Sequence, residues 1–487
     1  MGARTGQDYL RALNSYPREI WISGEKLSNG LRTHPAFRAM AHSMAHFYDV
    51  QNDPALSEQM TYVSPTSGEK VGMSFLQPRS EADLLKRHRM MKIWADYSGG
   101  MLGRTPDYLN SDLMALASAS KFFGRKDSRF EDNVQKYYEF IRENDLLLTH
   151  TLIHPQANRG VGPSKQSDPF LAARIVDKTD EGVVIRGARM LATLPLADEI
   201  LVFPSTVLRG TSEDAPYSFA FGLPVATKGL KFICRESFAE ESKFDHPLAS
   251  RFDEQDAVVV FDDVVVPWDR LFLLEDVEAA NNLQEVSGGI VHMAHQVMIK
   301  NVAKTEFILG VVSMIADTIG INEFQHVQEK IAKIIMLVES LKAMVRASEA
   351  DAALNQWGIM TPDFKPLNAG RNLFPRLYPN LRAVIQQLSA SGLMALPTEK
   401  DMESEIRKEI DLYYQAKNTP AEERIRLFRL AWDIAGSSFG SRQELYERFF
   451  FGDPVRMAGN LYNWYDRQPY KDRVMQLLHM DDETDTR

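Results

Sequence analysis

The sequence holds a single cysteine, Cys234, among its 487 residues. One thiol cannot form an internal disulfide, and it cannot supply the several thiolates that an iron–sulfur cluster or a thiolate zinc site requires. No apolar run reaches the ~18 residues of a membrane helix, and the N-terminus lacks the apolar core of a signal peptide. These absences indicate a protein of the reducing cytoplasm.

Basic charge and the common nucleotide-binding motifs are also scarce. The formal net charge of -10 disfavours nucleic acid and anionic membranes as partners. Neither Gly-x-Gly-x-x-Gly nor Gly-x-x-x-x-Gly-Lys occurs, so any dinucleotide cofactor is expected outside a Rossmann or P-loop domain. His154, His292 and His295 have no acidic partners at metal-ligand spacing, so we expect no metal site.

The patterns that are present divide the chain into three parts. Residues 1–145 are mostly helix and loop, with apolar residues at helical spacing in 39–48, 81–97 and 107–123. Residues 146–275 carry short β-type runs between turn residues, which predicts a small β barrel or sandwich. These runs are 182–187, 200–203, 218–223, 230–234, 257–261 and 264–266.

Residues 276–487 are again helical, most clearly over 326–347, where apolar residues recur every three or four positions. Such a stripe is typical of a core or of a subunit interface. We therefore predict an α+β fold of three domains: an N-terminal helical domain, a middle β-barrel domain and a C-terminal helical bundle.

Arg104, Tyr108 and His150 are the candidates to surround a phenolic oxygen. Thr105 and Pro106 predict a helix N-terminus at this point, where anionic groups are favoured. An arginine stabilises a phenolate, a histidine exchanges the phenolic proton near neutral pH, and a tyrosine donates a hydrogen bond. An arginine that only caps a helix or faces solvent remains an open alternative.

A second set of polar residues suits a cofactor or the far end of a substrate. Amide and guanidinium donors at Gln156, Asn158 and Arg159 match an isoalloxazine edge or a phosphate. Hydroxyl groups that suit a flavin nitrogen or a substrate carboxylate stand at Thr193, Ser205 and Thr206. A polar loop and threonines that merely fill a strand are the structural alternatives.

Two stretches resemble the acyl-CoA dehydrogenase fold. Phe261–Pro267 is similar to the signature at the end of its β domain, and Gly187–Thr193 resembles its flavin-facing strand. Residues 324–328 fall where that fold reaches flavin across a subunit interface. The resemblance implies an acyl-CoA dehydrogenase-like fold and, by analogy, a homotetramer assembled as a dimer of dimers.

A longer resemblance covers nearly the whole chain. Gly103–Asn110, His154–Arg159 and Phe451–Arg456 are similar, in this order, to the oxygenase (large) component of the two-component 4-hydroxyphenylacetate 3-monooxygenase family. Three motifs in order are far more specific than any one of them.

This resemblance implies a role for each candidate. Arg104, Tyr108 and His150 would bind the phenolic hydroxyl, and Ser205 with Thr206 would contact the side-chain end of the substrate. The implied contacts to FAD, bound as FADH2, are Gln156, Ala157, Asn158, Arg159, Thr193, Gln387, Gly452, Asp453, Pro454 and Val455. Since Leu191 is apolar, a hydrogen bond to flavin in that segment is expected from Thr193 or from the backbone.

The resemblance also implies the reaction. A separate NAD(P)H:flavin reductase supplies FADH2, oxygen adds at flavin C4a to give a hydroperoxide, and the ortho carbon of the phenol attacks its distal oxygen. Water must be kept out, and a loop near Leu208 to Pro216 is the expected gate. The expected conversion is of 4-hydroxyphenylacetate to 3,4-dihydroxyphenylacetate, without a metal.

Four alternatives differ in chemistry. 4-Hydroxybutyryl-CoA dehydratase shares the implied fold but needs several cysteines, and this chain has one. An acyl-CoA dehydrogenase needs a glutamate base, for which Glu329 and Glu339 remain open. A sibling hydroxylase would act on phenol, a chlorophenol or a nitrophenol, and a flavin-storage protein would bind flavin without forming a product.

Overall fold

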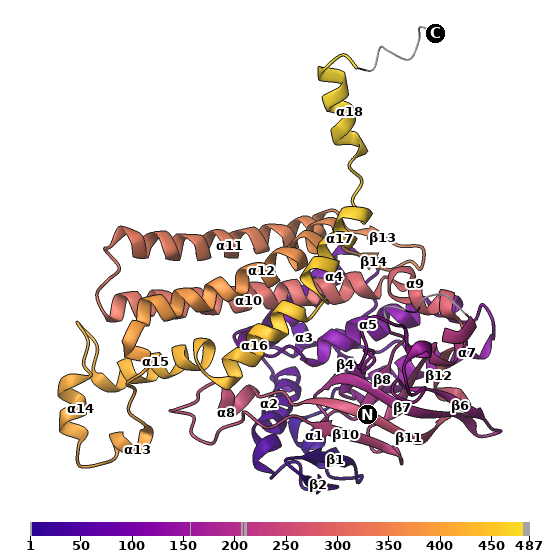
Figure 1. The fold of residues 1–487 in the computed structure, drawn as a ribbon, viewed down its shortest axis with the longest axis horizontal. Helices are drawn as coiled ribbons and strands as arrows, with labels where there is room; N and C mark the ends of the chain where they lie inside the picture. The colour runs from indigo at the N-terminus through magenta and orange to yellow at the C-terminus, as the bar shows by residue number, and fades with distance from the viewer. Residues whose placement is uncertain (1, 156, 206–207, 209–211, 481–487) are drawn as a thin grey trace.

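The computed structural model describes residues 2–155, 157–205, 208 and 212–480. Helices, then two sheets, then a helical bundle follow one another along the chain (Figure 1), which confirms the predicted three-part α+β architecture. None of the described helices combines the length and apolar character that a bilayer crossing requires.

The first part is mainly helical. The predicted helices lie within α2, α4 and the pair α5 and α6. Its elements are α1 Gly6–Ala12, β1 Glu19–Ile22, β2 Glu25–Leu27, α2 Pro35–Asn52, α3 Ser57–Met60, β3 Thr61–Val63, β4 Lys70–Gly72, η1 Met73–Phe75, α4 Glu81–Tyr97, α5 Pro106–Ser118, α6 Ser120–Phe123 and α7 Arg129–Asn144.

Strands β1 and β2 were not predicted, because this region was expected to be mostly helix and loop. β1 pairs in parallel with β10, and Ile20 lies opposite Phe232. A short strand whose partner lies so far along the chain has no local signal that would reveal the pairing.

The strands of the middle part form two sheets, one of which also includes β1 and β2 from the first part. The strand orders are β2-β1-β10-β11-β7-β6 and β12-β9-β8-β5. The two sheets pack face to face: the rings of Phe221 and Phe261 are 6.2 Å apart, and Thr149 Oγ1 donates to the Thr193 carbonyl at 2.5 Å. The elements are β5 Leu148–Thr151, η2 Pro163–Lys165, β6 Arg174–Lys178, β7 Gly182–Thr193, β8 Glu199–Val202, η3 Ser212–Tyr217, β9 Phe219–Pro224, β10 Leu230–Cys234, α8 Ala249–Phe252, β11 Asp256–Pro267, η4 Trp268–Arg270 and β12 Leu271–Leu274.

The two predicted runs at 257–261 and 264–266 are one strand, β11. Its register against β7 shifts between Phe261 and Val264, and Asp263 has φ 52°. The aspartate pair is therefore a β-bulge inside a continuous strand, where the extra residue leaves the ladder.

The last part packs around α10, which contacts α4, α5, α11 and α12. The helix predicted at 326–347 is confirmed as α11. The elements are α9 Val277–Ser287, α10 Gly289–Thr318, α11 Gln325–Ala350, β13 Ala353–Leu354, β14 Met360–Thr361, α12 Phe364–Ser389, η5 Ala390–Leu393, α13 Glu399–Met402, α14 Arg407–Tyr413, α15 Ala421–Ala435, α16 Ser438–Phe449, α17 Pro454–Trp464 and α18 Gln468–Leu477. Figure 1 shows α18 standing away from the body of the molecule.

Candidate active site

The structure brings Arg104, Tyr108 and His150 together. Arg104 precedes α5, Tyr108 lies in the first turn of α5, and His150 lies in β5. The guanidinium carbon of Arg104 is 4.8 Å from the centre of the Tyr108 ring, and the rings of Tyr108 and His150 are 6.0 Å apart. One arginine, one phenol and one imidazole therefore adjoin one another where α5 packs against β5.

Aromatic rings that the sequence did not single out complete this group. Arg104 also lies 4.9 Å from the centre of the Phe450 ring and 5.7 Å from that of Tyr446, at the end of α16. On the other side, the rings of His150 and Phe203 are 6.2 Å apart. We call Arg104, Tyr108, His150, Phe203, Tyr446 and Phe450 the phenol cage. The sequence contained one indication of Tyr446 and Phe450, which was the motif that begins at the next residue, Phe451.

Several buried polar atoms of the phenol cage have no hydrogen-bond partner in the described part of the chain. They are Arg104 Nε and Nη1, His150 Nδ1 and the Tyr446 hydroxyl. Buried polar atoms are nearly always paired, because an unmade hydrogen bond costs the full desolvation of the group. Convergent unpaired atoms therefore indicate a place for a polar ligand.

The protonation states suit a phenol. Burial and the nearby Arg104 hold the pKa of His150 well below its ordinary value, so the imidazole is neutral. Burial alone would lower the pKa of Arg104, but Tyr446, Tyr108 and Glu254 together raise it, so the guanidinium stays charged. A neutral imidazole can accept a hydrogen bond from a phenol, and the fixed cation beside it stabilises negative charge on the phenolic oxygen.

Glu254 positions Arg104 through the backbone. Its Oε1 accepts hydrogen bonds from the amides of Gly103 at 3.1 Å and Arg104 at 2.7 Å, and the side chain is fully buried. A Cβ atom at Gly103 would lie 2.1 Å from the Tyr446 hydroxyl, so only glycine lets α16 approach so closely.

The same carboxylate belongs to a buried ionic network, the Glu254–Arg442–Asp256 network. Arg442 Nη1 donates to Glu254 Oε2 at 2.8 Å, and Arg442 Nη2 donates to Asp256 Oδ1 at 2.7 Å. Asp256 Oδ1 also accepts from Thr193 Oγ1 at 2.9 Å. Thr193 was expected to donate to a flavin, but in this arrangement its proton is directed to Asp256.

The other candidates lie in three places. Gln156 and Thr206 lie outside the described residues, as do residues 209–211 of the expected gate. Ser205 is buried and follows Phe203 of the phenol cage by two residues. Gln387 is exposed on α12, and Ala157, Asn158 and Arg159 form an exposed loop after β5.

The segment Gly452–Val455 begins α17. Asp453 caps this helix by accepting hydrogen bonds from the amides of Val455 and Arg456, each at 3.0 Å. Because Phe450 belongs to the phenol cage, the segment starts immediately beside it. The structure thus places this predicted cofactor segment next to the predicted substrate residues, although more than three hundred positions separate them in sequence.

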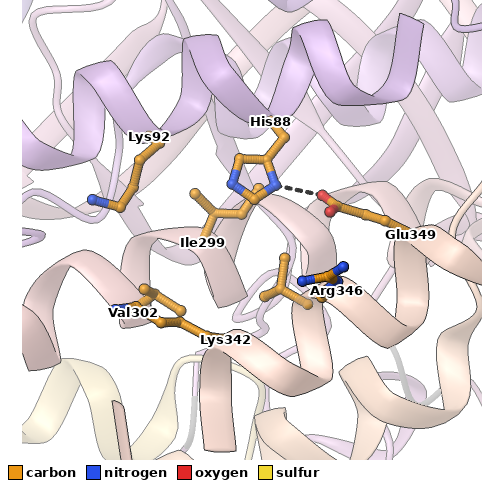
Figure 2. A pocket seen from close by; sticks show the side chains of 8 residues that line it. His88, Lys92, Ile299, Val302, Lys342, Arg346 and Glu349 are labelled. Carbon is orange, nitrogen blue, oxygen red and sulfur yellow. Dashed lines mark hydrogen bonds and ion pairs between the residues drawn. The ribbon is translucent and has the colours of Figure 1, made fainter. Parts of the chain in front are cut away.

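The expectation that His295 lacks an acidic partner was wrong. Glu349 Oε1 lies 2.7 Å from His295 Nε2 and 2.5 Å from His88 Nδ1, and these three residues could together offer ligand atoms within 4.8 Å of one another. His88 and Glu349 line a groove of about 320 Å³ together with Lys92, Lys342 and Arg346. Figure 2 shows how these side chains lie. The three residues come from α4, α10 and α11, so spacing along one helix could not reveal them. One nitrogen of each imidazole contacts the same carboxylate oxygen, which ties the three helices together, and we assign the cluster to helix packing.

Two family models together match most of the chain. The model described as 4-hydroxyphenylacetate 3-hydroxylase N terminal matches residues 5–273, and the model described as 4-hydroxyphenylacetate 3-hydroxylase C terminal matches residues 280–479.

Similar proteins carry a matching description. The 4-hydroxyphenylacetate 3-monooxygenase oxygenase component of Thermus thermophilus is 48% identical over 477 residues, which are 98% of this chain and 97% of that protein. Its counterpart from a Geobacillus species is 46% identical over 481 residues, 98% of this chain and 97% of that protein. A crystal structure of an oxygenase component of 4-hydroxyphenylacetate 3-monooxygenase, complexed with FAD and 4-hydroxyphenylacetate, matches with a TM-score of 0.94 and 47% identity, covering 98% of this chain and 99% of that one.

Proposed function

Because the chain belongs to the 4-hydroxyphenylacetate 3-hydroxylase family, we propose that it is an oxygenase that converts 4-hydroxyphenylacetate to 3,4-dihydroxyphenylacetate. One atom of O2 enters the ring, the other leaves as water, and FADH2 is oxidised to FAD. The observation that carries the proposal is the charged Arg104 beside the neutral His150, both with buried atoms that lack partners in the described residues.

The phenol cage supplies the activation of the substrate. The phenolic oxygen lies against Arg104 and Tyr108, and its proton faces His150 Nδ1, a buried nitrogen without a partner among the described residues. As the phenolic hydroxyl donates to His150, negative charge develops on its oxygen, where Arg104 stabilises it, and this charge is delocalised onto the ortho carbon. That carbon becomes the nucleophile. The aromatic rings of the phenol cage keep water from the reacting atoms.

Reduced FAD, when bound, supplies with O2 the electrophilic oxygen atom that this carbon takes up. The chain has groups that suit such a cofactor: exposed amide and guanidinium donors at Asn158 and Arg159, and the start of α17 at Gly452–Val455 beside Phe450. We propose these residues, together with Gln156, Ala157, Thr193 and Gln387, as the flavin contacts, and Ser205 with Thr206 as contacts to the substrate carboxylate.

The experiment that tests the function is anaerobic. The protein is mixed with FADH2 and 4-hydroxyphenylacetate, oxygen is admitted, and 3,4-dihydroxyphenylacetate is measured against the flavin oxidised. We expect one catechol per flavin, with little hydrogen peroxide. If 4-nitrophenol or phenol gives a catechol and 4-hydroxyphenylacetate gives none, the protein is a sibling hydroxylase that acts on another phenol. Peroxide alone with every phenol would overturn the proposal.

The proposal extends to partners. An NAD(P)H:flavin reductase supplies FADH2, the location is the cytoplasm, and the chain assembles as a homotetramer. Large apolar side chains that are exposed in the single chain support assembly: Met336 is 60% exposed, Leu445 is 60% exposed, and Leu477 on the projecting α18 is 79% exposed. Light scattering of the purified protein is expected to give the mass of four chains, and a monomer mass at assay concentration would contradict it.

A further inference from the structure

Arg371 is a buried cation without an anionic partner in the described part of the chain. It lies in α12 with 7% of its surface exposed, and its Nε and Nη1 atoms make no hydrogen bond there. Its Nη2 contacts the sulfur of Met457 at 3.7 Å, and its guanidinium carbon lies 4.9 Å from the centre of the Phe451 ring and 5.4 Å from that of Phe364. Burial lowers the pKa of Arg371 to about 10, so the group is charged at neutral pH.

An uncompensated buried charge is costly, because the interior replaces little of the hydration that the charge loses. Aromatic faces recover part of that cost, but they carry no full negative charge. A bound anion would compensate Arg371 fully. Its Nε and Nη1 atoms are free to donate charge-assisted hydrogen bonds to such an anion, and they point away from different edges of the planar guanidinium.

The position of Arg371 selects among the anions that the proposed function brings in. A row of rings runs from Phe203 through His150, Tyr108 and Phe450 to Phe451, with successive centres 4.7 to 6.2 Å apart. Arg371 lies at the Phe451 end of this row. The substrate carboxylate is expected near Ser205 at the Phe203 end, and the phenolate belongs to Arg104 in between. The remaining ligand is the flavin, whose proposed contact segment Gly452–Val455 follows Phe451 directly.

Flavin carries negative charge in two places. The reduced isoalloxazine ring loses the N1 proton near neutral pH and becomes an anion, whereas the oxidised ring is neutral; the pyrophosphate is charged in both states. A site walled by the half-buried rings of Phe364 and Phe451 and by the buried Met457 is largely apolar, so it suits a flat ring better than a strongly hydrated pyrophosphate. We propose that Arg371 binds the negative charge of the reduced flavin ring, and so makes the protein prefer reduced over oxidised flavin. This inference rests on the proposed function.

The test compares binding in the two redox states, without turnover. Dissociation constants for FADH2, under anaerobic conditions, and for FAD are measured for the wild type, Arg371→Gln, Arg371→Lys and Lys365→Gln. Arg371→Gln is expected to weaken the binding of reduced flavin by about 10- to 100-fold, which is the loss of one charge-assisted contact. The affinity for oxidised flavin should stay unchanged. Arg371→Lys keeps the charge and is expected to retain most of the affinity. Lys365→Gln removes an exposed charge from the same helix and serves as the matched control.

A second measurement separates this role from simple packing. Removing an uncompensated charge should raise the Tm of the flavin-free protein, so Arg371→Gln is expected to melt above the wild type. A lower Tm would assign Arg371 to packing and overturn the inference. An equal loss of affinity in both redox states would mean that Arg371 binds the pyrophosphate and not the flavin ring. Undiminished binding of reduced flavin would mean that Arg371 does not bind flavin at all. A wild type that binds neither form would overturn the proposed function as well.

Discussion

Replacing Arg104 by methionine is expected to lower the rate of coupled hydroxylation by about 10²- to 10³-fold, the typical cost of removing one donor aimed at a developing oxyanion. Methionine fills most of the space between Tyr108 and Phe450, so the change removes the charge more than the packing. Without the guanidinium, the phenolate is no longer stabilised, and the ortho carbon is a weaker nucleophile. Catechol formed per FADH2 oxidised, with the single-turnover rate, measures the loss.

A binding measurement isolates the charge effect from the oxygen chemistry. 4-Nitrophenol is yellow only as the phenolate, so its absorbance reports the ionisation of the bound phenol. A cation favours the phenolate, so the pKa of the bound phenol should lie lower on the wild type than on Arg104→Met. Arg104→Lys should give an intermediate value, because it keeps a charge but loses the planar fork. Arg129→Met, which removes a surface arginine paired with Asp127, is the control. Full coupled hydroxylation by Arg104→Met would refute the site.

The local parts of the fold could be predicted because their signals lie in neighbouring residues. The predicted helix 81–97 matches α4 at both ends, since Ser80 accepts the Asp83 amide as an N-cap and apolar residues follow at helical spacing. β1 could not be predicted, because its partner β10 lies in another part of the sequence. The bulge in β11 was also beyond prediction, since two aspartates between apolar runs are as typical of a turn as of a bulge.

The candidate site divides in the same way. The polar residues Arg104, Tyr108 and His150 could be proposed because their chemistry is visible in their types and in the motifs around them. Phe450 and Arg371 could not, because an aromatic or basic residue in an amphipathic helix is usually core or solvated surface. Their position follows from how α12, α16 and α17 pack on the rest of the chain, and no local pattern records that packing.

Replacing Arg442 by methionine is expected to reduce the free energy of unfolding by about 3–5 kcal/mol, the usual cost of breaking a buried ion pair. Arg442 pairs with Glu254 and Asp256, and its loss leaves two buried carboxylates without this cation. Burial alone would raise the pKa of Asp256, but Arg442 and Arg235 hold it below its ordinary value. The stabilisation is therefore complete above the unfolded-state pKa of about 4 and is lost as the pH falls below it. Urea unfolding at pH 7 and in acid measures both effects.

The same variant should impair catalysis more than a surface change of equal charge, because Glu254 holds the Arg104 amide and Asp256 holds the Thr193 hydroxyl. On the same helix, Arg448 is 42% exposed and pairs with Glu444, so Arg448→Met is the matched control and should cost under about 1 kcal/mol. Adding Glu254→Gln to Arg442→Met removes one stranded charge while an amide oxygen still accepts from the Arg104 backbone. The double variant should therefore lose less unfolding free energy than the two single variants lose in total. Strictly additive losses would mean that the Glu254–Arg442–Asp256 network does not act as a unit, and that Arg104 is positioned by other contacts.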